Sequence, residues 1–123
     1  MNIPEKYQQV MPYLIIEKAS GFILFMQKVF GAKEMYKQMR DGNKIMHAEI
    51  MIERSTIMFA DATDKFKQQN AGLFIYVENA DETFNKAIVN GAEIITEISD
   101  QSYGRSGGVK DPFGNAWWIT SQL

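Results

Sequence analysis

His47 and Glu49 are the residues whose types and spacing come closest to a catalytic pair. His47 is the only histidine among the 123 residues, and in an extended strand the two side chains point to the same face. An imidazole beside a carboxylate can act as a general base or contribute metal ligands. Because metal sites use three or four protein ligands, the pair can equally be a half-buried, hydrogen-bonded couple that lines a sheet.

A second group of candidate residues is aromatic. Under strand alternation, one face of the predicted sheet carries Tyr13, Phe74, Tyr76 and Trp118. Such side chains could form the wall of a cleft for a flat organic ligand, because rings offer a large apolar area with little flexibility. They could also be ordinary core, because aromatic residues are good strand formers.

The segment from Ser99 to Ser106 is polar and carries a glycine, which predicts a mobile loop. In this loop Arg105 could hold an anionic substrate or seal the cleft with its planar set of donors. It could equally be a solvated charge or the partner of a carboxylate. Tyr103 is a weaker candidate, and Asp111 is expected only to accept backbone hydrogen bonds in its own turn.

The elements that must position these residues occur twice along the chain. Gly31-Ala32 is echoed by Gly91-Ala92 sixty positions later, and the terminal strands around Ile57 and Trp117 repeat the same displacement. An offset that is nearly constant over several segments indicates a duplicated half-chain.

Each half is predicted to run strand, helix and three strands. Apolar residues at helical spacing predict a helix over about 18–30 that ends at Gly31, Asp41-Gly42 predicts a hairpin, and Asn79 with Glu82 resembles a capping box. The predicted strands of the first half are 10–16, 33–39, 44–53 and 56–61. Those of the second half are 72–77, 92–97, 107–110 and 116–121, with a helix over 80–90.

Alternation within residues 45–52 separates two faces. Met46, Ala48, Ile50 and Ile52 are uniformly apolar and are expected under the helix. The other face, which begins with Ile45 and continues with His47, Glu49 and Met51, mixes polar and apolar groups and is expected to line the cleft.

Composition limits the possible classes of function. The formal net charge of −2 and the scattered lysines argue against nucleic acid as a partner. The absence of cysteine excludes disulfides, thiolate metal sites and a cysteine nucleophile. No apolar run is long enough to span a bilayer and the N-terminus lacks the pattern of a signal peptide, so we expect no membrane association and a cytoplasmic location.

Taken together, these segments resemble the vicinal oxygen chelate superfamily, which includes glyoxalase I, extradiol dioxygenases and bleomycin-resistance proteins. The resemblance spans nearly the whole chain and is greatest to the PhnB-like subgroup. The segments that carry it are Pro12-Tyr13-Leu14, Phe30-Gly31-Ala32, His47-Ala48-Glu49, Tyr103-Gly104-Arg105 and Asp111-Pro112-Phe113-Gly114-Asn115. It implies an α+β fold of one domain, in which a mixed sheet built from two βαβββ modules (10–61 and 71–121, joined by a connector at 62–70) curls around a cleft. It also implies a homodimer.

In metal-dependent members of the superfamily, four His, Gln or Glu side chains bind a divalent ion. The resemblance places these positions at Met11, Met58, Gly72 and Trp118. None of these residues is a normal ligand for a hard or borderline cation, so no cofactor is expected. Asp61, three residues after Met58, could contribute a carboxylate to a relocated metal site.

Two classes of function remain open, and whether the protein is an enzyme is not decided. The favoured class is a metal-independent protein that binds a small organic molecule, as bleomycin-resistance members do. The alternative is a metal-dependent lyase, isomerase or dioxygenase with relocated ligands, among them His47 and Glu49. A third possibility is a domain whose cleft is filled by its own side chains. The expected cleft residues are Tyr13, His47, Glu49, Met58, Phe74, Tyr76, Tyr103, Arg105 and Trp118.

Overall fold

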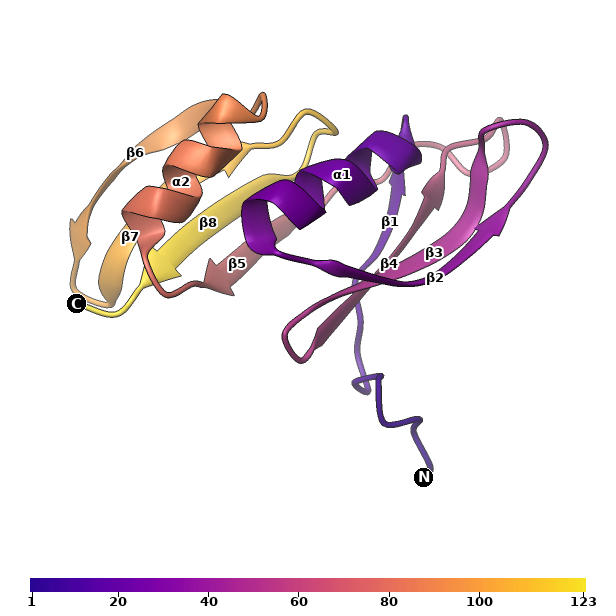
Figure 1. The fold of residues 1–123 in the computed structure, drawn as a ribbon, viewed down its shortest axis with the longest axis horizontal. Helices are drawn as coiled ribbons and strands as arrows, with labels where there is room; N and C mark the ends of the chain where they lie inside the picture. The colour runs from indigo at the N-terminus through magenta and orange to yellow at the C-terminus, as the bar shows by residue number, and fades with distance from the viewer. The chain divides into compact units, whose positions relative to one another are not determined.

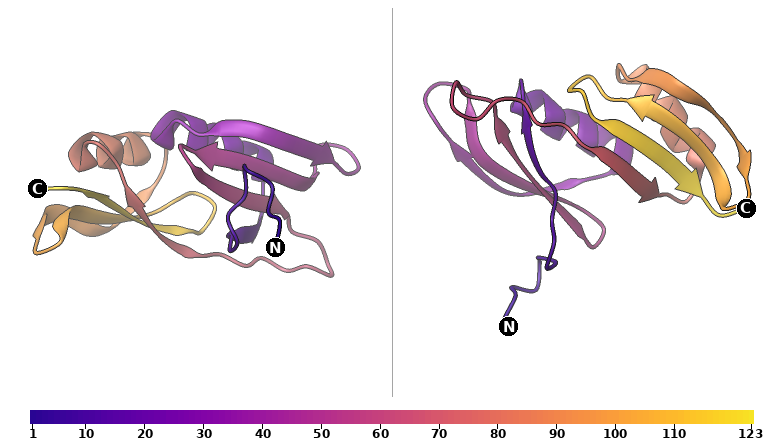
Figure 2. Two further views of the ribbon diagram at one scale, coloured as in Figure 1. Left: turned by 90° about the horizontal axis from the view of Figure 1, so that it is seen from below. Right: turned by 180° about the vertical axis from the view of Figure 1, so that it is seen from behind.

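The computed structural model describes all residues from 1 to 123, which divide into two compact units, Met1–Asn70 and Ala71–Leu123. Both units run strand, helix and three strands, and the chain can be followed through them in Figures 1 and 2. The first unit contains β1 (Tyr13–Ile16), α1 (Ala19–Phe30), β2 (Lys33–Met39), β3 (Ile45–Ile52) and β4 (Ser55–Asp61). The second contains β5 (Gly72–Tyr76), α2 (Ala80–Val89), β6 (Glu93–Gln101), β7 (Gly104–Lys110) and β8 (Ala116–Ser121).

Each unit forms its own four-stranded mixed sheet. The strand orders are β1-β4-β3-β2 and β5-β8-β7-β6, so the first strand of each unit pairs in parallel with the last. All other pairs are antiparallel. The predicted α+β class and the two βαβββ modules are therefore confirmed. The predicted strand at 10–16 is shorter in the structure, because β1 begins only at Tyr13.

The helix of each unit buries its apolar stripe on one face of the sheet. In α1, Phe22 and Met26 are fully buried, and the ring of Phe22 meets that of Phe59 edge to face at 5.0 Å. Burial of such side chains contributes about 1.5–3 kcal/mol each. The helix ends at Gly31, whose positive φ of 68° closes the last turn as predicted.

In the second unit, a ring of α2 rests directly on the backbone of the sheet. A Cβ at Gly107 would lie 2.8 Å from the ring of Phe84, so only glycine fits beneath it. The predicted capping role of Asn79 is confirmed, because its side-chain oxygen accepts a hydrogen bond from the backbone N–H of Glu82 at 3.1 Å.

In both units, the last residue of the last strand holds the start of the helix. The backbone N–H of Ala19 donates to Asp61 Oδ1 at 2.9 Å, and that of Ala80 donates to Ser121 Oγ at 3.2 Å. Asp61 also accepts from the backbone N–H of Ile45 through Oδ2 at 2.6 Å. The first N–H groups of a helix have no partner within the helix, so these two side chains fix each helix to its sheet.

The prediction of a mobile loop from Ser99 to Ser106 is wrong. The segment is a β-hairpin in which β6 runs to Gln101 and β7 starts at Gly104, with Gln101 paired to Gly104. Ser102 and Tyr103 form the connection, and Gly104 has a φ of 146°. Pairing between β6 and β7 satisfies the backbone N–H and C=O groups of this segment. Composition alone had suggested a loop because the side chains are polar.

The face assignment within β3 is also partly wrong. Gln38 pairs with His47 and Met39 pairs with Ile45, so Met46 is an extra residue in a bulge. A bulge shifts the alternation of side chains by one. Ile45 is consequently buried (0% exposed) with Ala48 and Ile50, whereas Met46, predicted to lie under the helix, is 44% exposed.

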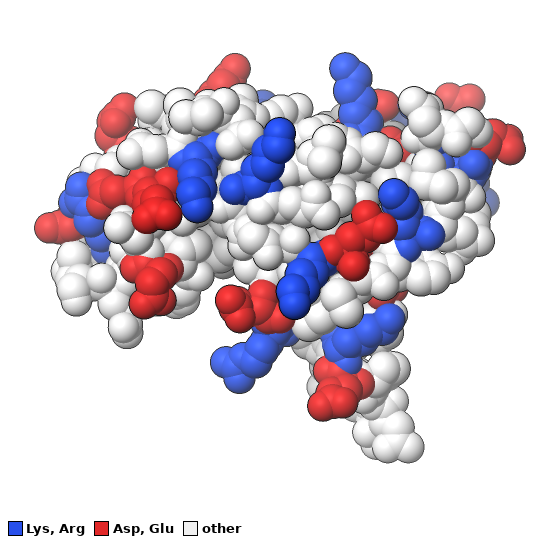
Figure 3. Space-filling view, viewed as in Figure 1, with Lys and Arg blue, Asp and Glu red and all other residues white.

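Neither helix is long and apolar enough to cross a membrane. On the face shown in Figure 3, basic and acidic side chains are interspersed, and neither sign forms a continuous field.

Replacing Asp61 with Ala should leave two buried backbone N–H groups without acceptors. We expect a loss of about 2–6 kcal/mol in the free energy of unfolding, because each of the two unsatisfied groups costs roughly 1–3 kcal/mol. Denaturant unfolding measures this loss. Asp64→Ala, which removes an exposed carboxylate of the connector, is the control and should change stability by less than about 0.5 kcal/mol. Equal stability of the two variants would contradict the role of Asp61.

Candidate functional site

In each unit, the face of the sheet opposite its own helix carries most of the candidate residues; we call it the open face. In the first unit, Phe59 packs under α1, so its neighbour Met58 points to the open face. Met58 is paired with Tyr13 on β1 and with Glu49 on β3, which places these three side chains in a row across the sheet. The alternation of β3 adds His47 to the same face.

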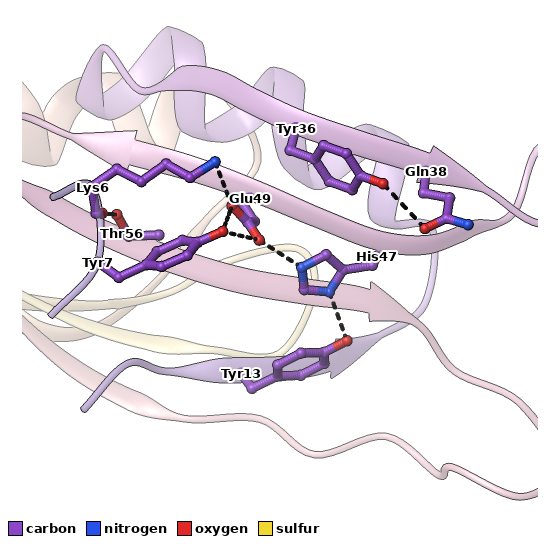
Figure 4. A network of polar contacts seen from close by, with 8 residues as sticks. All are labelled: Lys6, Tyr7, Tyr13, Tyr36, Gln38, His47, Glu49 and Thr56. Atoms are coloured by element: carbon purple, nitrogen blue, oxygen red, sulfur yellow. Dashed lines mark hydrogen bonds and ion pairs between the residues drawn. The ribbon is translucent and has the colours of Figure 1, made fainter. Parts of the chain in front are cut away.

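A chain of polar contacts connects these residues (Figure 4). The Tyr13 hydroxyl lies 2.9 Å from Nδ1 of His47, and Nε2 of His47 lies 2.8 Å from Oε2 of Glu49. Glu49 also accepts hydrogen bonds from the Tyr7 hydroxyl at 2.8 and 2.9 Å, and Lys6 Nζ lies 3.6 Å from its Oε1. Glu49 is only 4% exposed, so its charge is balanced by these neighbours rather than by bulk water.

The proton arrangement follows from the chemistry of the partners. An ionised carboxylate only accepts, so the Nε2 of His47 donates to Glu49. In the neutral imidazole, Nδ1 is then an acceptor, and the Tyr13 hydroxyl donates to it. Glu49 thereby orients the ring and the ring orients the phenol, which is an arrangement that can move a proton to or from a molecule at Tyr13. Tyr13 is 47% exposed and is therefore reachable.

The carboxyl group of Glu49 has a pKa below its ordinary value of 4.5. Burial alone would raise this pKa, but hydrogen bonds from His47 and Tyr7 and the charge of Lys6 outweigh it. The two phenols near Glu49 have pKa values above their ordinary value of 10.0. The bond to Glu49 raises the pKa of Tyr7, and burial raises that of Tyr13.

Sequence reasoning missed the N-terminal segment that supplies Lys6 and Tyr7. The segment is held to β4 because the Gln8 side chain exchanges hydrogen bonds with the backbone of Thr56, whose hydroxyl donates to the Lys6 carbonyl. No periodicity marks these residues, and the only hint is a tyrosine within a polar run. Their contacts span more than 40 positions of sequence.

The residues at the expected metal positions do not fit a divalent cation. Met11, Met58, Gly72 and Trp118 offer two thioethers, a hydrogen and an indole. The structure contains no group of three or more His, Cys, Asp or Glu side chains that could hold a metal ion. Asp61 does not join His47 and Glu49, because both of its oxygens accept backbone N–H groups at the start of α1 and of β3.

The open face of the second unit is aromatic. Phe74 and Tyr76 point away from the helix side of β5, and Phe74 pairs with Trp118 in register. The ring of Phe74 lies 5.2 Å from that of Tyr76 and 6.1 Å from that of Tyr103, measured between centroids. Trp118 is 36% exposed, Phe74 51%, Tyr103 56% and Tyr76 65%. We call these four side chains the aromatic face.

Gly108 allows the ring of Trp118 to lie flat on the sheet. A Cβ at Gly108 would stand 2.2 Å from Cζ3 of that ring, which no real contact allows. Beneath the rings, the hydroxyls of Ser106 and Thr120 bond to each other at 2.8 Å and are buried. The floor of the aromatic face is thus internally satisfied.

Arg105 does not belong to the aromatic face. It lies in β7 opposite Ser121, on the helix side of the sheet. Its Nε and Nη2 donate to the carboxylate of Asp81 at 2.6 and 3.0 Å, and its Nη1 donates to Asp100 at 2.9 Å. These bonds hold the pKa of Asp81 below its usual value and raise that of Arg105. Of the interpretations open from sequence, a link to carboxylates is the one that the structure supports.

Three comparisons with known proteins match this chain. A sequence model of the Glyoxalase/Bleomycin resistance protein/Dioxygenase superfamily matches residues 13–119. An uncharacterized protein of Mycobacterium bovis is 30% identical over 118 residues, which cover 86% of this chain and 78% of that protein.

Solved structures match at lower identity. The PhnB protein from Bacillus cereus, described as a putative 3-demethylubiquinone-9 3-methyltransferase, has a TM-score of 0.72 and 19% identity over 93% of this chain and 99% of that one. TnmS3, an antibiotic binding protein from a Streptomyces species, has a TM-score of 0.72 and 12% identity over 95% of this chain and 100% of that one. At these identities the likeness establishes a shared fold.

The lowered pKa of Glu49 predicts part of the acid sensitivity of the protein. Ionised Glu49 stabilises the folded state at pH values above its unfolded pKa, and this contribution is lost as the pH falls through the lower folded pKa. In Glu49→Gln, the free energy of unfolding should therefore fall less steeply between about pH 5 and pH 3 than in the wild type.

Urea unfolding across this pH range gives the slope. Glu34→Gln serves as the matched control, because Glu34 is a half-exposed carboxylate of the neighbouring strand that pairs only with Lys37. We expect its acid dependence to follow the wild type. Parallel curves for all three proteins would contradict a lowered pKa of Glu49 in the folded state.

Proposed function

We propose that this chain is a PhnB-like protein that binds a small, flat organic molecule without a metal. The premise is that the chain belongs to the Glyoxalase/Bleomycin resistance protein/Dioxygenase superfamily. The ligand lies against the aromatic face of the second unit. The observation that carries this proposal is the group of four large aromatic side chains that stay 36–65% exposed on one face of one sheet.

Exposed aromatic area of this kind favours a ligand of matching chemistry. Four adjacent rings form a continuous apolar patch, and such patches on a protein surface mark binding sites. The rings are held by the sheet, and Trp118 in particular is fixed over Gly108. Because little side-chain freedom remains to be lost, a planar molecule can stack at a small entropic cost.

The donor chemistry favours binding over metal catalysis. The four positions at which the family would place metal ligands offer no suitable oxygen or nitrogen, so an ion chelated at those positions is not the source of ligand affinity. TnmS3, which shares the fold, is an antibiotic binding protein. A planar natural product is therefore the class of ligand to test first.

An enzyme remains the second candidate because of one observation. His47 is held between Glu49 and Tyr13 at 2.8 and 2.9 Å, and a carboxylate that orients an imidazole is the arrangement used for proton transfer. A divalent ion bound by both His47 and Glu49 would have to take the place of the proton between Nε2 and the carboxylate. This candidate is a lyase, isomerase or dioxygenase with its metal relocated to His47 and Glu49.

The binding proposal is tested with a panel of neutral planar aromatics such as coumarin, flavone and anthraquinone, with affinity measured by equilibrium dialysis. Phe74→Ala should weaken the best binder about 2- to 12-fold, because one aromatic contact contributes roughly 0.5–1.5 kcal/mol. Val89→Ala, which removes an exposed apolar side chain from α2 of the same unit, should not change the affinity. Absence of binding by the whole panel, or equal affinity of both variants, would contradict the proposal.

A glycine pair gives an independent check that leaves every aromatic residue in place. Gly108→Ala displaces the ring of Trp118 and should weaken the same ligand, whereas a Cβ at Gly72 meets nothing within 4 Å. Gly72→Ala should therefore bind like the wild type. Circular dichroism must first establish that both variants are folded.

The enzyme candidate is tested by native mass spectrometry after incubation with Zn²⁺, Ni²⁺, Mn²⁺ and Fe²⁺ in turn, which also reports whether the protein is the homodimer that we expect. One metal per chain in the wild type and none in His47→Ala would favour the enzyme. If no ion is retained, or if His47→Ala retains it equally, metal does not bind at this pair.

A further inference from the structure

We propose that the first unit contains a second binding site, which takes a small organic anion with an apolar body. The site is a pocket of about 590 Å³, a volume typical of small-molecule sites. All of its lining residues belong to the first unit, and none belongs to the aromatic face. The proposal therefore goes beyond the proposed function and does not depend on it.

The connector between β4 and β5, residues 62–70, forms one wall of the pocket through Thr63, Lys65, Phe66 and Gln69. The course of the connector can be followed in Figure 2. This segment is held along β1 at both ends. Ala62 donates to the carbonyl of Ile16 at 2.8 Å, and Ile15 and Gln69 exchange backbone hydrogen bonds at 2.8 and 3.1 Å. The wall is thus part of the hydrogen-bonded structure rather than a loose loop.

A tight turn in the connector, closed between Thr63 and Phe66, presents the side chains of Lys65 and Phe66 to the pocket. The N–H of Thr63 donates to the carbonyl of Phe66, and the N–H of Phe66 donates to the hydroxyl of Thr63, both at 2.8 Å. Between them, Lys65 is exposed and its Nζ lies 5.4 Å from the centre of the Phe66 ring. The turn therefore sets an ammonium group beside an aromatic surface.

The remaining surface of the pocket is largely apolar. Ile15 and Ala60 are register partners on the parallel strands β1 and β4, and both line the pocket beside Tyr13. The bulge in β3 adds Met46, whose side chain would lie under the helix if the strand alternated regularly. Phe66, 58% exposed, completes an apolar surface that suits a hydrocarbon or aromatic body.

The charged side chains of the pocket favour an anion. Arg40 and Lys65 both line it, and the ion pairs that lysines form in the first unit involve Lys6 and Lys37 instead. The one lining carboxylate, Asp61, is 4% exposed and already accepts the backbone N–H groups of Ala19 and Ile45. Arg40 and Lys65 are thus left to a ligand, and a guanidinium fork matches a carboxylate or phosphate.

The experiment compares two probes of the same shape, 2-naphthoate and the neutral 2-naphthamide, by isothermal titration calorimetry. The anion should bind at least about tenfold more tightly than the amide, because hydrogen bonds to charged groups are the stronger ones. In the double variant Arg40→Gln/Lys65→Gln this preference should disappear. Lys67→Gln is the matched control, since Lys67 is an exposed lysine of the same connector that does not line the pocket.

The other outcomes identify the source of a failure. Equal affinity for anion and amide in the wild type, or an unchanged preference in the double variant, would overturn the pocket proposal. Loss of naphthoate binding in Phe74→Ala but not in the double variant would place the anion on the aromatic face, so that only the pocket proposal fails. Binding that survives Phe74→Ala and is lost in the double variant supports the pocket whether or not the aromatic face has a ligand.

Discussion

The hydrogen bond between the end of the last strand and the start of the helix is the constraint on which each unit depends. Asp61 accepts from Ala19 in the first unit and Ser121 accepts from Ala80 in the second. The two acceptors are 60 positions apart and the two donors 61, so the contact is repeated with the duplication. In each unit this bond joins the last strand to the first turn of the helix. The helix directly follows the first strand, which is the parallel partner of the last strand.

Because the helix is fixed to one face, the other face of each sheet is left for its own chemistry, and the two units use it differently. In the first unit it carries a polar chain in which a buried glutamate orients a histidine and a tyrosine. In the second it carries exposed rings above an internally bonded pair of hydroxyls. The fold is common to both units, and the side chains of the open face determine what each can bind.

Asp61 links the fold to the proposed pocket. Its carboxylate has two backbone donors, at the start of α1 and at the start of β3. Both oxygens are therefore engaged by the fold, and the carboxylate that lines the pocket is already hydrogen-bonded before a ligand enters. Arg40 and Lys65 therefore set the charge that a ligand meets there.

The sequence by itself determined the elements and their order, because apolar spacing, turn residues and the sixty-residue repeat are local signals. It also determined the cap at Asn79 and the shared face of Phe74 and Tyr76, since both follow from position within one element. Trp118 joins that face through the pairing of β8 with β5. Tertiary structure decided what depends on strand pairing. The bulge at Met46 reversed the faces at the start of β3, and pairing with β6 placed Arg105 in a strand beside Asp81. The contact of Tyr7 with Glu49 joins residues 42 positions apart, and no local pattern encodes a partner at that distance.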